Sequence, residues 1–416
     1  MLRILRDSLK TSGMAIVQLA ATAIASVLWA RAIGPAEMGE FLLAIAVAST
    51  AAFVCNPSLY AAANYFISAK KATAQSLWWT HMILTAMVSG VAVLAAVAAF
   101  FLLRGGATQR LPFVALMTVG TISYHNFSAV LYGSQRVTRV TLWSAGWGII
   151  YLLLTIYMLA GDHAATAWQP IVAYSLTQGL QGLGLIGLAY PNGVSRRWNG
   201  VLAREMVRYG MSVYFGRIAT FLNQRLDTFL IVTLLNDEAL GLYGVATTFA
   251  ELLWQLPNAV NLVLLANIAT LAPLLAIRRT EYTGRLIFTI VLGGACLLGI
   301  VGGWLVPLVY GETYVGSVAP LLWLLPGIIM LSTFGIIETH FRALDRPLIP
   351  SYAAAFGVLI NIVCNLILIP RYQLVGAAIA STIAYSVQSI WLAALWGRQT
   401  KQNGAKLFFP ILRRYR

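Results

Sequence analysis

"NQRLDTFLIVTLLNDEALGLYGVATTFAELLWQLP" (Asn223–Pro257) contains two long apolar runs on either side of a short polar turn at Asn236–Glu238. Both runs extend beyond this stretch to the length of about 20 residues that crosses a hydrocarbon core of roughly 30 Å. The first run nevertheless contains Arg225 and Asp227. The stretch therefore predicts two membrane-spanning helices, the first of which carries charges that need an explanation.

The composition of the whole chain extends this prediction. Of its 416 residues, 59% are hydrophobic and only 10% are charged, and the mean hydropathy is +0.78. These values are typical of a polytopic membrane protein. Dividing the chain at its charged residues, glycines and prolines predicts twelve spans, at residues 11–32, 38–67, 77–103, 111–133, 140–160, 168–189, 206–235, 239–277, 284–310, 318–341, 349–370 and 374–396.

Two of the predicted spans have unusual features. Residues 239–277 are too long for one straight span, so we expect Pro257 to kink this helix or Pro273 to end it near the surface. The first span follows three basic residues, and its apolar run is longer than the core of a signal peptide. We expect it to be a retained helix.

Positive charge is distributed unevenly between the two sides of this topology. With both termini in the cytoplasm, 22 of the 28 lysines and arginines fall on the cytoplasmic side and four on the opposite side, leaving Arg217 and Arg225 within the seventh span. This distribution fits the positive-inside rule. The net charge of +15 is therefore explained by topology and by attraction to anionic membrane lipids, and we expect no nucleic-acid partner.

Motifs of catalysis and of metal binding do not occur in the chain. Cys55, Cys296 and Cys364 fall within predicted spans, without metal or disulfide spacing. The sequence has no phosphate-binding loop, paired-histidine motif or nucleophile elbow. Its longest predicted loop, residues 190–205, is far smaller than the extramembrane region that a membrane glycosyltransferase or ligase would need for acid–base chemistry. We expect a protein that is not an enzyme and that has no cofactor and no metal, with a glycosyltransferase or ligase as the second alternative.

Several features recur about 200 residues apart in the two halves of the chain. Gly39-x-Phe41 corresponds to Gly241-x-Tyr243, and Pro57 corresponds to Pro257. Further along, Gly133-Ser134-Gln135-Arg136 corresponds to Ala343-Leu344-Asp345-Arg346. The common order of these matches predicts a duplication of six plus six helices, and the repeats are parallel because six is an even number.

The predicted fold is an all-α polytopic membrane protein with about twelve transmembrane helices. Two six-helix bundles, residues 1–189 and 206–397, are expected to enclose a central cavity. Residues 190–205 form the predicted cytoplasmic linker, and residues 398–416 form a basic cytoplasmic tail.

Three stretches of the chain resemble the polysaccharide exporters of the multidrug/oligosaccharidyl-lipid/polysaccharide superfamily, specifically the Wzx-type flippases. They are "RAIGPAEMGEF" (Arg31–Phe41), "NQRLDTFLIVTLLNDEALGLYGVATTFAELLWQLP" (Asn223–Pro257) and "NIVCNLILIPRYQLVGAAIASTIAY" (Asn361–Tyr385). The resemblance implies alternating access, with a lipid diphosphate-linked glycan taken from the cytoplasmic leaflet and released at the outer leaflet of the bacterial cytoplasmic (inner) membrane. The implied carrier is undecaprenyl diphosphate. The implied partners are this anionic glycan lipid, membrane lipids, and a polysaccharide polymerase and co-polymerase.

A transporter of an anionic head group needs cationic or hydrogen-bonding side chains in a water-filled lumen, because a charge that faces lipid costs several kcal/mol. On a helical wheel, the polar side chains of the seventh span share one broad face. Arg225 and Asp227 point about 160° apart on this wheel and cannot neutralise each other across one turn. The candidate cavity residues are Arg217, Thr220, Asn223, Gln224, Arg225 and Asp227, together with Glu251 of the eighth span.

Alternatives remain for several of these residues. Arg225 and Asp227 would also fit snorkelling to the outer interface or static pairing with neighbouring helices. Glu251 fits a gating partner of Arg217 or Arg225, a site of proton or sodium coupling, or a static pair. For the whole chain, the alternative function is a cation-coupled multidrug exporter of the same superfamily, although the first six spans contain no acidic residue apart from Glu40 at the entry of the second.

Polar residues elsewhere in the spans predict structural roles. Glu338 fits an interfacial anchor or a partner of Arg342 at i+4. Asn361 and Asn365, one turn apart, are expected to hold helices together. His81 is expected to be a packing histidine with its polar atoms satisfied.

Overall fold

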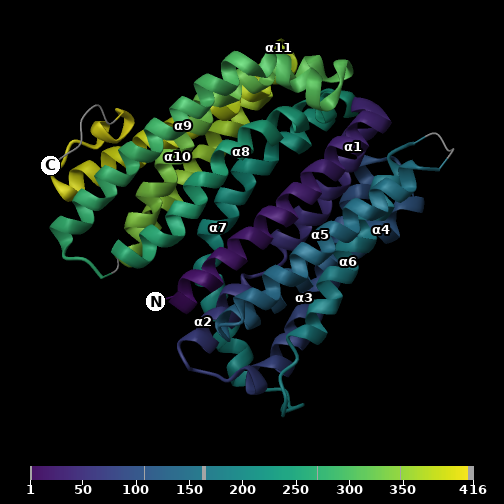
Figure 1. The fold of residues 1–416 in the computed structure, drawn as a ribbon. Coiled ribbons are helices and arrows are strands. Elements are labelled where there is room, and N and C mark those ends of the chain that lie inside the picture. Colours follow the sequence, from purple (N-terminus) through teal and green to yellow (C-terminus); the bar gives the residue numbers. More distant parts are fainter. Residues whose placement is uncertain (1, 107, 162–164, 269, 347, 411–416) are drawn as a thin grey trace. The chain divides into compact units, whose positions relative to one another are not determined.

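The computed structural model describes residues 2–106, 108–161, 165–268, 270–346 and 348–410; side chains are described from residue 13 onward, except those of residues 220, 262, 263 and 266. In these ranges the regular secondary structure is helical, without strands (Figure 1). Its α-helices are α1 (Leu2–Val54), α2 (Leu59–Ser68), α3 (Ala74–Leu103), α4 (Leu111–Gly133), α5 (Val137–Leu159), α6 (Trp168–Leu188), α7 (Gly200–Leu234), α8 (Asp237–Ile268), α9 (Pro273–Tyr310), α10 (Val318–Ala343) and α11 (Leu348–Thr400).

Two helices are long enough to hold two predicted spans each. α1 contains a non-helical residue at Gly34 (φ 75°, ψ 176°), and α11 contains one at Gln373 (φ 52°, ψ −130°). Both residues fall in the predicted connections between spans. Ten of the twelve predicted spans coincide with helical segments to within one residue. Eight helices in the described part of the chain are long and apolar enough to cross a membrane, and α7 and α8 are not among them.

Two predicted boundaries are wrong, and proline is involved in both. Residues 38–67 do not form one helix, because α1 ends at Val54 and α2 begins at Leu59. Pro57, which lacks a backbone N–H, lies in the break, and Ser58 has a left-handed backbone (φ 52°). Residues 239–277 also belong to two helices. Pro273 starts α9 rather than ending α8, since the first position of a helix needs no N–H donor, while Pro257 lies inside α8.

The two matching turns after α4 and α10 have the same backbone hydrogen bonds. Gln135 after α4 and Asp345 after α10 both have φ 58°. In each turn the next residue donates its backbone N–H five residues back, Arg136 to Leu131 at 2.8 Å and Arg346 to Phe341 at 2.9 Å. This is the Schellman arrangement of a helix end. The two matching sequences identified above therefore fold into the same turn.

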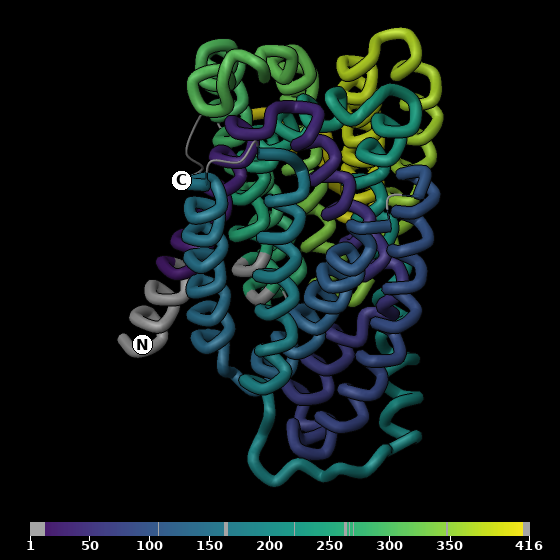
Figure 2. The backbone as a smooth tube through the Cα atoms, turned by 90° about the vertical axis from the view of Figure 1, so that its right-hand side faces the viewer, coloured from purple at the N-terminus to yellow at the C-terminus, as the bar shows by residue number. Residues whose placement is uncertain are grey.

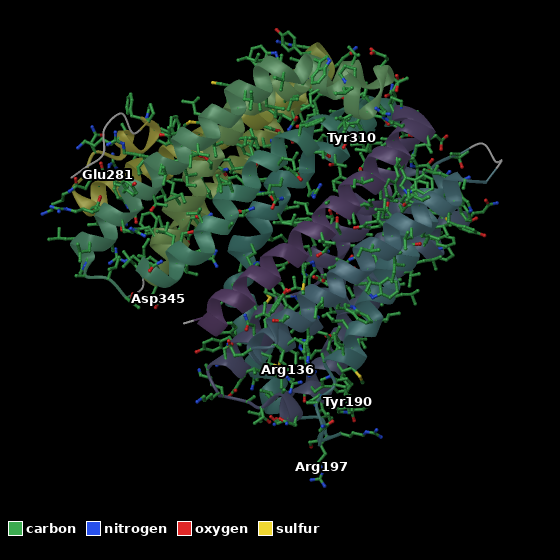
Figure 3. All side chains as sticks on the ribbon, in the orientation of Figure 1. Arg136, Tyr190, Arg197, Glu281, Tyr310 and Asp345 are labelled. Carbon is green, nitrogen blue, oxygen red and sulfur yellow. The ribbon has the colours of Figure 1, made fainter. Side chains whose placement is uncertain are left out.

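The chain divides into two compact units, Met1–Phe215 and Gly216–Arg416, whose boundary falls within α7. In the first unit, the labelled residues Arg136, Tyr190 and Arg197 lie at one end of the helices (Figure 3). The connection from α6 to α7 runs across this end (Figure 2). In the second unit, Glu281 and Asp345 lie at one end and Tyr310 at the other (Figure 3). The basic residues Arg136, between α4 and α5, and Arg197, between α6 and α7, thus lie at the same end of the first unit.

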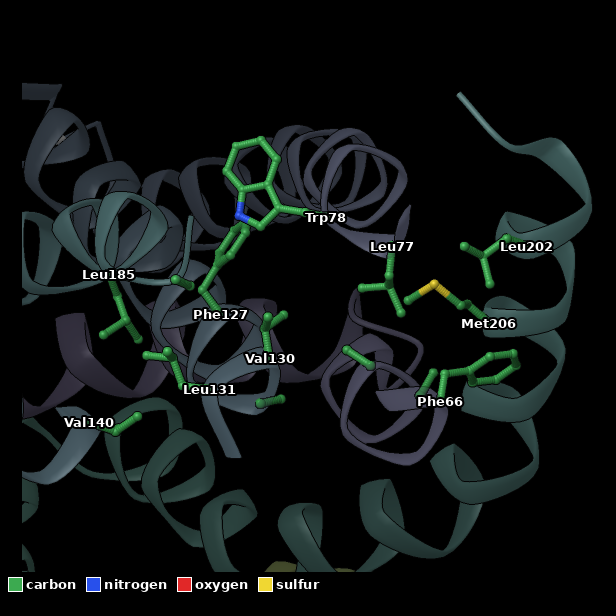
Figure 4. Close-up of a cluster of buried hydrophobic side chains, with 14 residues drawn as sticks. Phe66, Leu77, Trp78, Phe127, Val130, Leu131, Val140, Leu185, Leu202 and Met206 are labelled. Atoms are coloured by element: carbon green, nitrogen blue, oxygen red, sulfur yellow. The ribbon is translucent and has the colours of Figure 1, made fainter. Parts of the chain in front are cut away.

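The first turns of α7 pack into the hydrophobic core of the first unit. Leu202 and Met206 of α7 belong to a buried cluster with Phe66 of α2, Leu77 of α3 and Phe127 of α4 (Figure 4).

The backbones of α4 and α6 lie in direct contact. A Cβ atom on Gly182 would lie 2.0 Å from the carbonyl oxygen of Gly120, so these two helices pack backbone against backbone, as small residues allow in membrane proteins.

Candidate functional site

A buried carboxylate lies at the centre of the second unit. Asp227 of α7 is 4% exposed. The Tyr243 hydroxyl of α8 donates to its Oδ2 at 2.9 Å, and the Asn365 amide of α11 donates to its Oδ1 at 2.9 Å. Ser381, in the second half of α11, donates a short hydrogen bond to Oδ2. The carboxylate is therefore held by neutral donors from α8 and from both halves of α11.

A second layer of amides extends this cluster. Asn361, one turn before Asn365, accepts a hydrogen bond from it at 3.0 Å and donates to Ser381 at 3.4 Å. Asn223, one turn before Asp227, donates to Gln388 at 2.9 Å, and both are buried. The prediction that Asn361 and Asn365 hold helices together is confirmed. We refer to Asn223, Asp227, Tyr243, Asn361, Asn365, Ser381 and Gln388 as the polar cluster.

The polar face of α7 predicted from the helical wheel is divided in the structure. Asn223 and Asp227 point into the second unit, whereas Arg217, Gln224 and Arg225 are exposed. The side chain of Thr220 lies outside the described residues. Consequently, one edge of the predicted face is packed within the bundle, and the adjacent edge presents two guanidinium groups at its surface.

Glu251 of α8 is exposed as well. It lies within electrostatic range of Tyr385, as do Arg225 and Asp227. Tyr385 in turn reaches the backbone oxygen of Asn223 at 3.4 Å. Of the predicted site residues, Asn223 therefore contacts Tyr385 directly, and Tyr385 itself was not among the predicted site residues.

A small enclosed cavity borders the polar cluster. Its lining includes Asn223, Gln224, Glu338, Tyr385 and Gln388. Its volume of about 20 Å³ is enough for one water molecule, and its polar lining supplies the two to four partners that a buried water needs. Exposed Gln224 and buried Asn223 thus meet at the same cavity.

The chemistry available to this arrangement follows from its donors and acceptors. A carboxylate buried among neutral hydroxyl and amide groups has no cationic partner among the residues that bond to it. Such a group is able to exchange a proton, or to attract a small monovalent cation that the surrounding oxygen atoms would coordinate.

Among the residues expected to have structural roles, Glu338 has the predicted partner and His81 is buried as predicted. Glu338 lies 3.9 Å from Arg342 at i+4. His81 is fully buried, with Nε2 3.1 Å from the backbone oxygen of Asn126, whereas its Nδ1 has no hydrogen-bond partner among the described residues, so the expectation of satisfied polar atoms holds for only one ring nitrogen. The three cysteines are free, in agreement with the absence of disulfide spacing.

In the first unit, the position that corresponds to Tyr243 holds an aromatic ring without a hydroxyl. Phe41, the predicted counterpart of Tyr243, packs edge-on against Tyr174 with ring centroids 5.8 Å apart. Tyr174 also packs against Tyr151 at 5.6 Å. Sequence reasoning missed Tyr243, Ser381 and Gln388 as site residues. The available signal was the hydroxyl that distinguishes Tyr243 from Phe41.

Comparisons with known proteins support the same fold. A family model described as polysaccharide biosynthesis protein matches residues 27–319. The chain is 24% identical over 285 residues to the probable flippase AglR of Haloferax volcanii, covering 66% of this chain and 58% of that protein. It is also 24% identical over 290 residues to the uncharacterized membrane protein MJ1068 of Methanocaldococcus jannaschii, covering 65% and 55%. The chain thus spans less than two thirds of the length of these relatives.

Solved structures extend the comparison to almost the whole chain. The lipid II flippase MurJ in an inward closed conformation has a TM-score of 0.77 at 13% identity, covering 97% of this chain and 90% of that one. An inward-facing multidrug resistance MATE family transporter of the MOP superfamily has a TM-score of 0.70 at 15% identity, covering 94% and 98%. These similarities confirm the predicted all-α polytopic membrane fold.

Proposed function

Because the chain belongs to the polysaccharide biosynthesis protein family, we propose that it flips lipid-linked oligosaccharide or polysaccharide repeat units between membrane leaflets by alternating access. It is a flippase-like, multi-pass membrane transporter of the MOP superfamily. In our proposal the carrier is undecaprenyl diphosphate, and movement is from the cytoplasmic to the outer leaflet of the bacterial cytoplasmic membrane. Both termini are cytoplasmic in this proposal, and the transporter catalyses no reaction.

The observation that carries this proposal is the exposure of Arg217, Gln224 and Arg225 on α7. Charged side chains within membrane-spanning helices are costly unless they face water, another charge or a polar ligand. A diphosphate supplies the negative charge and the acceptor oxygens that guanidinium groups bind best. We therefore assign the first contact with the head group to Arg217 and Arg225.

The polar cluster has a different role in this proposal. Asp227 is buried and bonded to three helical segments, so a large head group has no direct access to it. This packing role corresponds to static pairing with neighbouring helices, the alternative that the sequence left open for Asp227. We assign Asp227 to the internal order of the second unit, and the substrate-facing role to the exposed residues of the same helix and to Glu251.

Substitution of Arg217 tests the proposal. Deletion of the gene should cause lipid-linked repeat units to accumulate on the cytoplasmic face, and the wild-type gene should restore surface glycan. The Arg217→Ala variant should restore about tenfold less surface glycan than the wild type, although the variant protein should reach the membrane in normal amount. Arg217→Lys should recover part of the loss because it keeps the charge without the bidentate geometry. The matched control is Arg204→Ala, which removes an exposed arginine near the start of the same helix.

Two results would contradict the proposal. Near-normal glycan export by Arg217→Ala would remove this residue from the mechanism. Normal surface glycan in the deletion strain, together with raised sensitivity to drugs, would instead favour the multidrug exporter.

A further inference from the structure

The end of α11 and the segment that follows it form a second structured region in the second unit. Lys401 has a left-handed backbone (φ 56°), and Gln402 donates its N–H to the oxygen of Gly397 at 3.1 Å. The chain then folds back along α11. A Cβ atom on Gly404 would lie 2.1 Å from the oxygen of Ala393. The segment from residue 401 to 410 therefore rests directly on the helix backbone.

The same segment is anchored to α9. Leu407 is fully buried, and a Cβ atom on Gly284 would meet its side chain at 2.8 Å. Arg285 donates to the backbone oxygens of Phe409 at 3.3 Å and Pro410 at 3.1 Å. These contacts fix the segment as a wall beside α11.

A groove of about 640 Å³ lies beside this contact and is lined by both the wall and the helix. Most of its lining is apolar or small, including Ile390 and Ala394 of α11 and Phe408 of the wall. Arg398 and Lys401 line one end of it. Residues 390–410 contain no acidic side chain. The groove therefore combines an apolar channel with a cationic end.

The length of the groove matches one membrane leaflet. Ile390 and Lys401 are separated by about 16 Å along the axis of α11, at about 1.5 Å per residue. One leaflet contributes about 15 Å to a hydrocarbon core of roughly 30 Å. An acyl chain lying along α11 would therefore place its phosphate beside Arg398 and Lys401.

We propose that this groove binds an anionic phospholipid, with an acyl chain along α11 and the phosphate on Arg398 and Lys401. Charge complementarity selects the head group, since basic clusters at a membrane surface attract anionic lipids. The small side chains along the helix leave space for the chain. The site is separate from the exposed residues of α7 and does not depend on the transported substrate.

Lipid binding to the detergent-solubilised full-length protein tests this site. By native mass spectrometry, phosphatidylglycerol should bind at least tenfold more tightly than phosphatidylcholine with the same acyl chains. The double variant Arg398→Ala/Lys401→Ala should lose this preference. Ala394→Phe, at an exposed position of the groove, should weaken both lipids equally. The control variant Arg196→Ala/Arg197→Ala removes two exposed cations from the first unit and should keep the preference.

Three results would overturn the proposal. They are equal binding of the two lipids by the wild type, an unchanged preference in the Arg398→Ala/Lys401→Ala variant, and an equal loss in the control. Inorganic phosphate is a further probe. If it displaced phosphatidylglycerol at millimolar concentration, the acyl chain would contribute nothing and the lipid site would be refuted. Thermal melting without added lipid should be the same for all variants, because the substituted residues are exposed.

Discussion

Removing the carboxylate of Asp227 should destabilise the second unit much more than removing its charge. Asp227→Ala leaves the donors of Tyr243, Asn365 and Ser381 without their acceptor. At about 1 kcal/mol for each hydrogen bond in a membrane protein, the loss is about 3 kcal/mol. Asp227→Asn keeps the shape and one acceptor oxygen, and its amide is able to donate to a neighbouring hydroxyl. Its cost should be about 1 kcal/mol.

Thermal unfolding of the purified protein measures this difference. For a domain of about 200 residues, 1 kcal/mol corresponds to about 2–4 °C in Tm. Asp227→Ala should therefore melt about 6–12 °C below the wild type, and Asp227→Asn about 2–4 °C below it. Tyr243→Phe, which removes a single donor, should resemble Asp227→Asn. The reasoning is refuted if Asp227→Ala melts like the wild type, or if Asp227→Asn is as damaging as Asp227→Ala.

The first unit offers two further predictions. Gly182→Ala should lower the Tm by several degrees and reduce yield in the membrane, because its Cβ would overlap the oxygen of Gly120; Gly187→Ala, where a Cβ meets nothing within 4 Å, is the matched control and should be neutral. Asn126→Leu should destabilise by about 2 kcal/mol, because Asn56 donates to Asn126 at 3.0 Å and Asn126 donates to Thr85 at 3.0 Å. Chemical denaturation would measure this loss, and a variant as stable as the wild type would show that the buried amide contributes no net stability.

Much of the fold could be predicted because membrane-spanning helices leave a strong local signal. Each span is a run of apolar residues, and the hydrocarbon core sets its length. The errors arose where an apolar run hides a change of direction. The break at Pro57 lies inside continuous hydrophobic sequence, and Asn56 stabilises it by accepting the N–H of Leu59 at 3.0 Å. Proline is compatible with a kink, a break or a helix start, and hydropathy does not distinguish them.

The candidate site was predictable only on the helix that carries it. The charges of α7 stand out against its apolar residues, which drew attention to Asp227 from sequence. Its partners do not stand out, because a tyrosine or a serine in a span is common. Tyr243 and Ser381 are 16 and 154 residues away from Asp227 in the chain. Only the packing of α8 and α11 against α7 identifies them.

The sequence separation within the polar cluster has a consequence for biogenesis. Ser381 is synthesised 154 residues after Asp227, which takes roughly 8–30 s at about 5–20 residues per second. During this interval α7 carries a carboxylate without its partner in the last helical segment, and an aspartate at the centre of a span costs about 3 kcal/mol on insertion. We therefore expect the packing of α7 to be completed only after the second half of α11 has emerged, although α7 itself is synthesised much earlier.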